Sequence, residues 1–386
     1  MGNKKKKKKR GGAATTVIIL ILAIAVLGAM MYEGGVFDRL LGKNTGSGET
    51  IESGSDGVDE FTMHFVGTQS SSDEDLYTNS VSSSSSSETG DTEEVKQLSS
   101  YNVHSDNALM IRLRDGAVFF DKASTEKMYP ASMTKIMTCI LALENIPDLN
   151  TSITINQEDI DANFDEGASR AGFEAGETVP AKDILYGIML PSGAECCEAI
   201  CRWVAGSDDK FVEMMNQKAQ DLGMTNTHFT NAIGLHDDNH YSTCADFIKL
   251  EAYALKNETF KTIFTTRNYT TTATQQHPQG ITMTNNSFRH LETTNLSNGA
   301  LYEGGKTGYT DEALQTLASI AKYGDDEYIM VTAHGGGTEH ANIDDAVTLY
   351  SRLGTDEVAG TEPTATPTPT AAETTQAPSG TQAAAQ

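Results

Sequence analysis

Positively charged side chains are scarce in this chain of 386 residues, which has 28 Lys and Arg against 53 Asp and Glu. The formal net charge at pH 7 is −25. A surplus of negative charge repels nucleic acid and other acidic polymers. We therefore expect no nucleic-acid partner, and we attribute the charge to solubility.

Cysteines are few and odd in number: Cys139, Cys196, Cys197, Cys201 and Cys244. An odd set in which three members fall between residues 196 and 201 does not suit a disulfide framework. Cys197 and Cys201 are one helical turn apart, a spacing that a metal or redox pair would also use. We favour the simpler interpretation, in which these are small buried residues at helix-packing positions.

A long hydrophobic run near the N-terminus follows a basic block, Lys4 to Arg10. The run, residues 13–32, reaches the roughly 20 residues needed to cross a bilayer. Because cytoplasmic flanks are rich in Lys and Arg, residues 1–12 are predicted to be cytoplasmic and everything after Tyr32 extracytoplasmic. No clear A-x-A site follows, so we favour an uncleaved single-pass anchor in the cell membrane over a cleaved signal peptide or a buried core helix.

Two segments have too few apolar residues to fold. Residues 33–100 are rich in Ser and acidic residues, and residues 356–386 are rich in Thr, Pro and Ala. Such compositions cannot bury enough apolar surface to offset the entropy of ordering, so a disordered tether and a disordered tail are predicted. The remaining residues, 101–355, form the predicted catalytic domain, which is long enough for a full hydrophobic core.

Within this domain the hydrophobic pattern changes between strand and helix periods. Residues 108–113 and 117–120 flank Asp115-Gly116, which predicts a hairpin. The alternating runs 314–323 and 328–334 predict two more antiparallel strands. Helices are predicted after Pro130 and over 181–190, 195–204, 208–222, 243–255 and 338–353. We expect an α/β (α+β) fold with an antiparallel sheet flanked by helices, not a doubly wound parallel sheet.

Three short motifs occur in order: Ser132-Met133-Thr134-Lys135, Ser192-Gly193-Ala194 and Lys306-Thr307-Gly308. Each alone has an ordinary interpretation, as a helix cap, a turn or the entry to a strand. Together, and each on a suitable element, they match the set found in penicillin-reactive serine acyl-transferases. We therefore interpret the three as one active site.

Ser132 is the predicted nucleophile, and a serine hydroxyl needs a neighbouring base at neutral pH. Lys135 lies about one helical turn later and takes this role if burial and the cation Lys306 lower its pKa. The helix N-terminus at Ser132 and the backbone N–H of Tyr309 are predicted to stabilise the oxyanion.

The other two motifs act on the leaving side of the scissile bond. Ser192 is predicted to relay a proton to the leaving amine and to lie exposed on a turn between helices. The predicted substrate-binding residues are Lys306, Thr307, Gly308 and Tyr309. Lys306 and Thr307 would attract a substrate carboxylate, and the strand that carries them would pair with an extended peptide.

The chain resembles the serine-type D-alanyl-D-alanine carboxypeptidases, the low-molecular-mass penicillin-binding proteins. The resemblance extends over most of the folded part, in residues 129–138, 189–193, 211–216, 222–224, 229–243 and 305–310. It implies a β-lactamase/transpeptidase-like fold and removal of the terminal D-alanine from peptidoglycan stem pentapeptides through an acyl-enzyme on Ser132. It also implies that β-lactam antibiotics acylate the same serine as covalent inhibitors, and it implies no metal or organic cofactor.

Two features depart from the pattern of this family. Ala194 replaces an Asn whose amide, by the resemblance, contacts the substrate backbone and the active-site lysine. Losing one such contact costs about 1–3 kcal/mol, which slows an enzyme without necessarily inactivating it. Glu195 is a candidate to compensate in part. In addition, little chain follows Leu353, so the β-rich C-terminal domain of many relatives is expected to be missing.

Three alternatives remain. A peptide- or penicillin-binding module without turnover is favoured by Ala194 but opposed by the intact Ser132 and Lys135. A β-lactamase would need a deacylating Glu-x-x-Leu-Asn, which Glu292-Thr293-Thr294-Asn295 does not match. A metallo-peptidase is weakest, because His236 and His240 lie in a loop without a clear third ligand.

Overall fold

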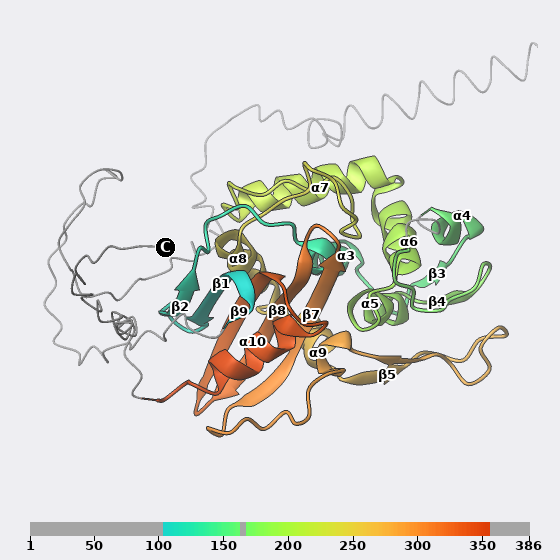
Figure 1. Cartoon of the computed structure of the whole chain (residues 1–386). Coiled ribbons are helices and arrows are strands. Elements are labelled where there is room, and N and C mark those ends of the chain that lie inside the picture. Colours follow the sequence, from blue (N-terminus) through green and yellow to red (C-terminus); the bar gives the residue numbers. More distant parts are fainter. Residues whose placement is uncertain (1–102, 163–166, 356–386) are drawn as a thin grey trace, which may run out of the picture. The chain divides into compact units, whose positions relative to one another are not determined.

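The computed structural model describes residues 103–162 and 167–355 (Figure 1). The expected membrane segment, tether and tail lie outside these residues. Within the described ranges no helix has both the length and the hydropathy to cross a membrane.

A five-stranded sheet forms the centre of the described part. Its strands are β1 (Ser105–Arg112), β2 (Val118–Lys122), β7 (Leu301–Thr310), β8 (Leu314–Tyr323) and β9 (Asp326–Gly335). The strand order is β2-β1-β9-β8-β7, and every neighbouring pair is antiparallel. The predicted hairpins, and the antiparallel sheet that they implied, are therefore confirmed. β7, the strand that carries Lys306-Thr307-Gly308, lies at one edge.

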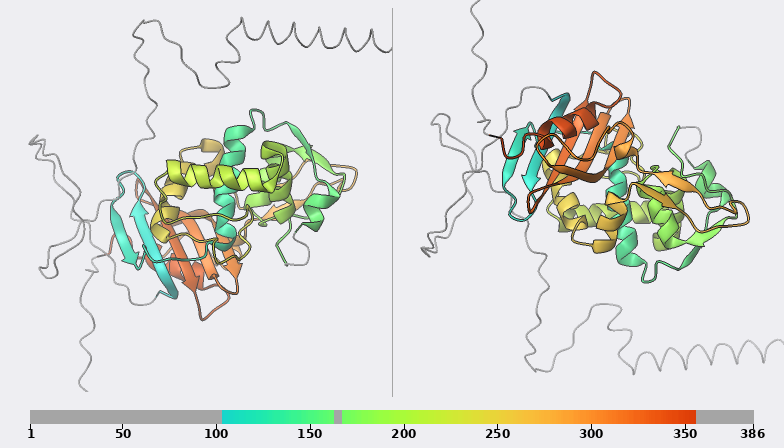
Figure 2. Two further views of the ribbon diagram at one scale, coloured as in Figure 1. Left: turned by 90° about the horizontal axis from the view of Figure 1, so that it is seen from above. Right: turned by 90° about the horizontal axis from the view of Figure 1, so that it is seen from below.

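Side chains alternate between the two faces of the sheet, as the two-residue period of a strand requires. On β1, Ala108 and Met110 join the cluster that includes Tyr350 of α10 (Ala341–Tyr350), whereas Leu109 and Ile111 join the larger cluster on the other face. Helix α10 covers the first face and α8 (Cys244–Ala254) the second (Figures 1 and 2). Because both faces are covered, the middle residues of the central strands β1, β8 and β9 are buried on both faces.

The helices α3 (Lys135–Asn145), α5 (Ala181–Met189), α6 (Ala194–Ala205) and α7 (Asp208–Asp221) follow the predicted ranges, as do α8 and, over a shorter span, α10. The helices α4 (Gln157–Asp161) and α9 (Glu258–Thr265) were not predicted. Short 3-10 turns occupy η1 (Ala131–Thr134) and η2 (Asn286–Phe288). Two small hairpins, β3 (Ser152–Thr154) with β4 (Thr178–Pro180) and β5 (Asn268–Thr270) with β6 (Thr282–Thr284), were not predicted.

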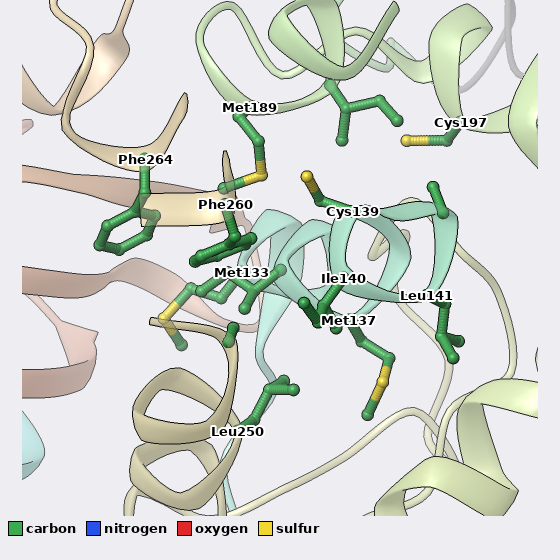
Figure 3. Close-up of a cluster of buried hydrophobic side chains, with 14 of the residues drawn as sticks. Met133, Met137, Cys139, Ile140, Leu141, Met189, Cys197, Leu250, Phe260 and Phe264 are labelled. Atoms are coloured by element: carbon green, nitrogen blue, oxygen red, sulfur yellow. The ribbon is translucent and has the colours of Figure 1, made fainter. Parts of the chain in front are cut away.

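Helix α3 is buried on all sides for its first eight residues, Lys135 to Ala142. A helix that is surrounded in this way needs apolar residues around its whole circumference. Figure 3 shows Met137, Cys139 and Ile140 of this helix among Met189, Phe260 and Phe264. All five cysteines are buried and free, which confirms that they are packing residues.

Candidate active site

Ser132 lies in the η1 turn, directly before α3, and two glycines let neighbouring backbone approach that turn closely. A Cβ atom on Gly308 of β7 would stand 2.8 Å from the Ser132 nitrogen, and one on Gly234 would stand 1.9 Å from the carbonyl oxygen of Ala131. Ala131 itself has a left-handed backbone, with φ of 46°. The nucleophile is thus held between strand β7 and the loop around Gly234.

Lys135 is the first residue of α3 and contacts the predicted nucleophile. Its Nζ donates to Ser132 Oγ at 3.2 Å and to the carbonyl oxygen of Ile233 at 2.6 Å. The side chain is buried, and this burial lowers the pKa of the Lys135 ammonium, an effect partly opposed by Cys197 and Glu195. An amine with a lowered pKa beside a serine hydroxyl is suited to accept its proton.

Ser192 and Lys306 form a second serine–lysine pair. Lys306 Nζ donates to Ser192 Oγ at 2.9 Å and to the carbonyl oxygen of Thr307 at 2.7 Å. Burial lowers the pKa of Lys306 well below its usual range, and the charge of Lys135 lowers it further. The fold therefore brings Ser192 and Lys306 together, although they are 114 positions apart in the sequence.

The prediction that Ser192 is exposed is wrong, because the side chain is only 3% accessible. Its turn between α5 and α6 is covered by η2 and β7. The backbone N–H of Asn286 donates to the carbonyl oxygen of Leu190 at 3.1 Å. The side-chain amide nitrogen of Asn286 lies 3.5 Å from the carbonyl oxygen of Pro191. Ser192 adopts φ of 70°, a left-handed conformation that these contacts hold in place.

A cleft of about 420 Å³ opens at Ser132 and Lys135. It is lined by residues 167–169, which we call the cleft wall, and by residues 233–236 and 309–312. Tyr309, one of these lining residues, is 55% exposed. Thr307 and Gly308 lie on the same strand, between Lys306 and Tyr309.

At the second motif, Ala194 has an apolar environment and the adjacent Glu195 has a polar one. Ala194 is buried and opens helix α6. Glu195 was expected to compensate in part for the missing Asn side chain. Its Oε1 instead accepts hydrogen bonds from the backbone N–H groups of Ala171 and Gly172, at 2.7 and 2.9 Å. This carboxylate therefore does not replace the amide that the family pattern has at residue 194.

The two histidines considered as metal ligands have different surroundings. His236 lines the cleft and packs edge-on against Tyr129, with ring centroids 4.7 Å apart. His240 is buried, with Nδ1 accepting from the Thr230 backbone N–H at 3.1 Å and Nε2 lying 2.8 Å from Thr134 Oγ1. In the described ranges no three His, Cys, Asp or Glu side chains are grouped to hold a metal ion.

Several functional neighbours were not found by reasoning from the sequence. They are the Ile233 carbonyl, the wall at 167–169 and the Asn286 contacts to the Ser192 turn. One signal was available for the loop beside Ser132, because Asn231 precedes Gly234 by three residues. Its Oδ1 accepts from the backbone N–H groups of residues 233–235, a turn that Asn favours.

Comparisons with known proteins agree with this geometry. The peptidase S11 model, described as D-alanyl-D-alanine carboxypeptidase, matches residues 92–335. The D-alanyl-D-alanine carboxypeptidase DacF of Bacillus subtilis is 33% identical over 229 residues, which cover 58% of this chain and 56% of DacF. A D-alanyl-D-alanine carboxypeptidase of Streptomyces sp. (strain K15) is 33% identical over 222 residues, which cover 54% of this chain and 73% of that protein.

The crystal structure of the Streptomyces K15 DD-transpeptidase is also similar, with a TM-score of 0.60 and 27% sequence identity. The match covers 65% of this chain and 98% of that one. By contrast, the chain spans about half the length of some curated relatives, including 57% of DacA from Escherichia coli. The family model covers more than half of the chain and includes all three motifs. The chain belongs to the peptidase S11 family of serine-type D-alanyl-D-alanine carboxypeptidases.

Proposed function

We propose that this protein removes the terminal D-alanine from peptidoglycan stem pentapeptides through an acyl-enzyme on Ser132. The observation that carries the proposal is the contact between Lys135 Nζ and Ser132 Oγ, 3.2 Å apart at the floor of an open cleft. The ammonium is buried, and the resulting fall in its pKa increases the fraction of neutral amine that can take the serine proton.

The reaction has two halves. Ser132 Oγ attacks the carbonyl carbon of the penultimate D-alanine while its proton passes to Lys135. The tetrahedral intermediate then breaks the C–N bond, and the leaving D-alanine nitrogen takes a proton from the Ser192 hydroxyl, a proton that Lys306 replaces. Water next attacks the ester carbonyl, and its proton returns to Lys306 through Ser192. As the ester bond breaks and the shortened peptide leaves, Lys135 returns its proton to Ser132 Oγ.

The edge position of β7 supports the mode of substrate binding. An extended peptide can add to an exposed sheet edge through backbone hydrogen bonds. Among the described strands β7 pairs with β8 alone, and a single bridge joins its first residue, Leu301, to Asn295. In this arrangement Lys306 and Thr307 attract the terminal carboxylate, while Gly308 and Tyr309 lie along the acyl part of the peptide. β-Lactams acylate Ser132 by entering the same cleft.

The proposed location is the outer face of the cell membrane, with the N-terminus in the cytoplasm. Support comes from the sequence alone: the basic residues 4–10 precede the apolar residues 13–32. The chain should sediment with membranes and resist extraction by salt, and external protease should remove the catalytic domain from intact spheroplasts. Release of the chain by salt would contradict an integral anchor.

Release of D-alanine tests the proposed reaction. The purified full-length chain is incubated with a peptide that ends in D-Ala-D-Ala, beside the Ser132→Ala variant. D-Alanine release that disappears in the variant supports the carboxypeptidase. A folded wild-type protein that releases none would contradict it.

A second candidate function is a peptide- or penicillin-binding module, and the observation that favours it is the apolar Ala194 at the second motif. Such a module would bind the peptide saturably without releasing D-alanine, so the same experiment separates the two. A β-lactamase is less well supported, because Glu292 lines a separate cavity against α10 and not the Ser132 cleft.

A further inference from the structure

One wall of the cleft has no regular secondary structure and depends on helix α6 for its position. Residues 167–169 line the cleft and belong to an irregular segment that continues to Glu177, directly before β4. The backbone N–H of Ala194 donates to the carbonyl oxygen of Ser169 at 2.8 Å. A Cβ atom on Gly193 would stand 2.8 Å from the Ala171 Cβ, so the wall packs directly on the first turn of the helix.

Glu195 supplies the side-chain part of this attachment. Its Oε1 accepts from the N–H groups of Ala171 and Gly172, and the residue is 1% exposed. Buried N–H groups that lose their acceptor cost free energy, so this oxygen stabilises the observed position of the wall. The second oxygen, Oε2, is buried and has no hydrogen-bond partner among the described residues.

We propose that Glu195 is a positioning residue whose Oε1 holds the segment 167–173, which includes the cleft-lining residues 167–169, against the first turn of α6. The kinetic consequences rest on the proposed carboxypeptidase reaction, whereas the effect on the wall does not. Glu195→Gln keeps an oxygen that accepts hydrogen bonds, and Glu195→Ala removes the acceptor.

Hydrogen exchange of the full-length chain tests the attachment without any substrate. Peptides that cover residues 167–173 should exchange roughly tenfold faster or more in Glu195→Ala, and near the wild-type rate in Glu195→Gln. Peptides from β8 and β9 serve as the internal reference for global stability. Unchanged exchange at 167–173 in Glu195→Ala, or equal acceleration everywhere, would overturn the role in the wall.

Steady-state kinetics with the D-Ala-D-Ala peptide test the effect on catalysis. Glu195→Ala should raise KM roughly tenfold because the wall that orients the peptide loosens, whereas Glu195→Gln should leave KM close to wild type. A KM that stays at the wild-type value in a folded Glu195→Ala protein would overturn the effect on substrate binding.

Glu195→Gln is the matched control for Glu195→Ala, because it keeps the side-chain oxygen that accepts from residues 171 and 172. A KM that rises equally in both variants would overturn the assignment of the wall to this oxygen. If the wild type releases no D-alanine, the proposed function fails, and the exchange experiment still decides the attachment.

Discussion

At the scale of single residues, the site consists of two serine–lysine pairs with different surroundings. Lys135 contacts Ser132 at the cleft, whereas Lys306 contacts a Ser192 that is buried. Burial lowers the pKa of both ammonium groups, and the charge of Lys135 lowers the pKa of Lys306 further. This arrangement places a lysine with a lowered pKa beside each of the two serines.

The alanine at the second motif gives a prediction at this scale. Ala194→Asn should raise kcat/KM by about 5- to 150-fold, which corresponds to one restored polar contact of about 1–3 kcal/mol. Ala194→Val, with a side chain of similar size and no amide, should give no gain. The comparison is made on D-alanine release at fixed pH. If valine and asparagine have equal effects, the missing amide is not what limits the enzyme.

His240 gives a second prediction, on stability. Burial lowers the pKa of this imidazole to about 4, whereas an unfolded histidine titrates near 6.5. Between these values the unfolded chain binds a proton that the folded chain does not, so the free energy of unfolding falls as the pH drops from about 6.5 to 4. The expected loss is about 3 kcal/mol in total.

Urea unfolding between pH 4 and 7 measures this effect as the difference between the wild type and His240→Gln. Glutamine retains a donor and an acceptor but does not titrate, so its stability should fall less steeply with acid. Curves that stay parallel over the whole range would show that His240 does not contribute to the acid sensitivity.

At the scale of elements, the contact between β7 and η1 sets the position of the nucleophile. The glycine of the third motif is required there, because a Cβ on Gly308 would stand 2.5 Å from Thr316 Oγ1 and 2.8 Å from the Ser132 nitrogen. Gly308→Ala should therefore displace η1 and slow acylation of Ser132 by roughly 100-fold. The rate of labelling by a fluorescent penicillin measures this.

Gly336→Ala is the control for that variant. Its added Cβ would meet only Leu314 Cδ1, at 3.8 Å, so labelling should proceed at the wild-type rate. Normal labelling of a folded Gly308→Ala protein would show that the close approach of β7 does not position Ser132.

Elements with a clear period were predictable from sequence, and elements without one were not. Helix α5 and strand β8 follow patterns of 3.6 and 2 residues, so their ranges agree closely with the prediction. β3 and β5 have three residues each, which is too short for an alternation to be recognised. The burial of Ser192 was missed because it depends on η2 and β7, which are distant in the sequence.

At the scale of the whole molecule, the order of the three motifs predicted that they meet, but not what surrounds them. Lys135 contacts the carbonyl of Ile233, 98 positions away, and Ser192 contacts Lys306. Such contacts are set by how α3, α6 and β7 pack together, and a backbone carbonyl has no side-chain signature in the sequence. The family resemblance supplied the motifs, whereas the cleft walls required the structure.

The Ser-rich residues 43–100 give a prediction at this scale. If they act as a flexible tether, a chain of this length has a root-mean-square span on the order of 40 Å. Shortening the segment should leave D-alanine release from soluble peptide unchanged and reduce the trimming of intact cell wall. If the shortened chain trims intact cell wall as well as the wild type does, residues 43–100 do not serve to extend the distance that the catalytic domain can reach.

The central claim is that Ser132 forms a covalent acyl-enzyme with Lys135 as its base. Mass spectrometry of the full-length chain after reaction with benzylpenicillin, followed by peptide mapping, tests it most directly. The account predicts an adduct on the peptide that contains Ser132, and no adduct in Ser132→Ala. An adduct on another residue, or a folded wild-type chain that remains unmodified, would contradict it.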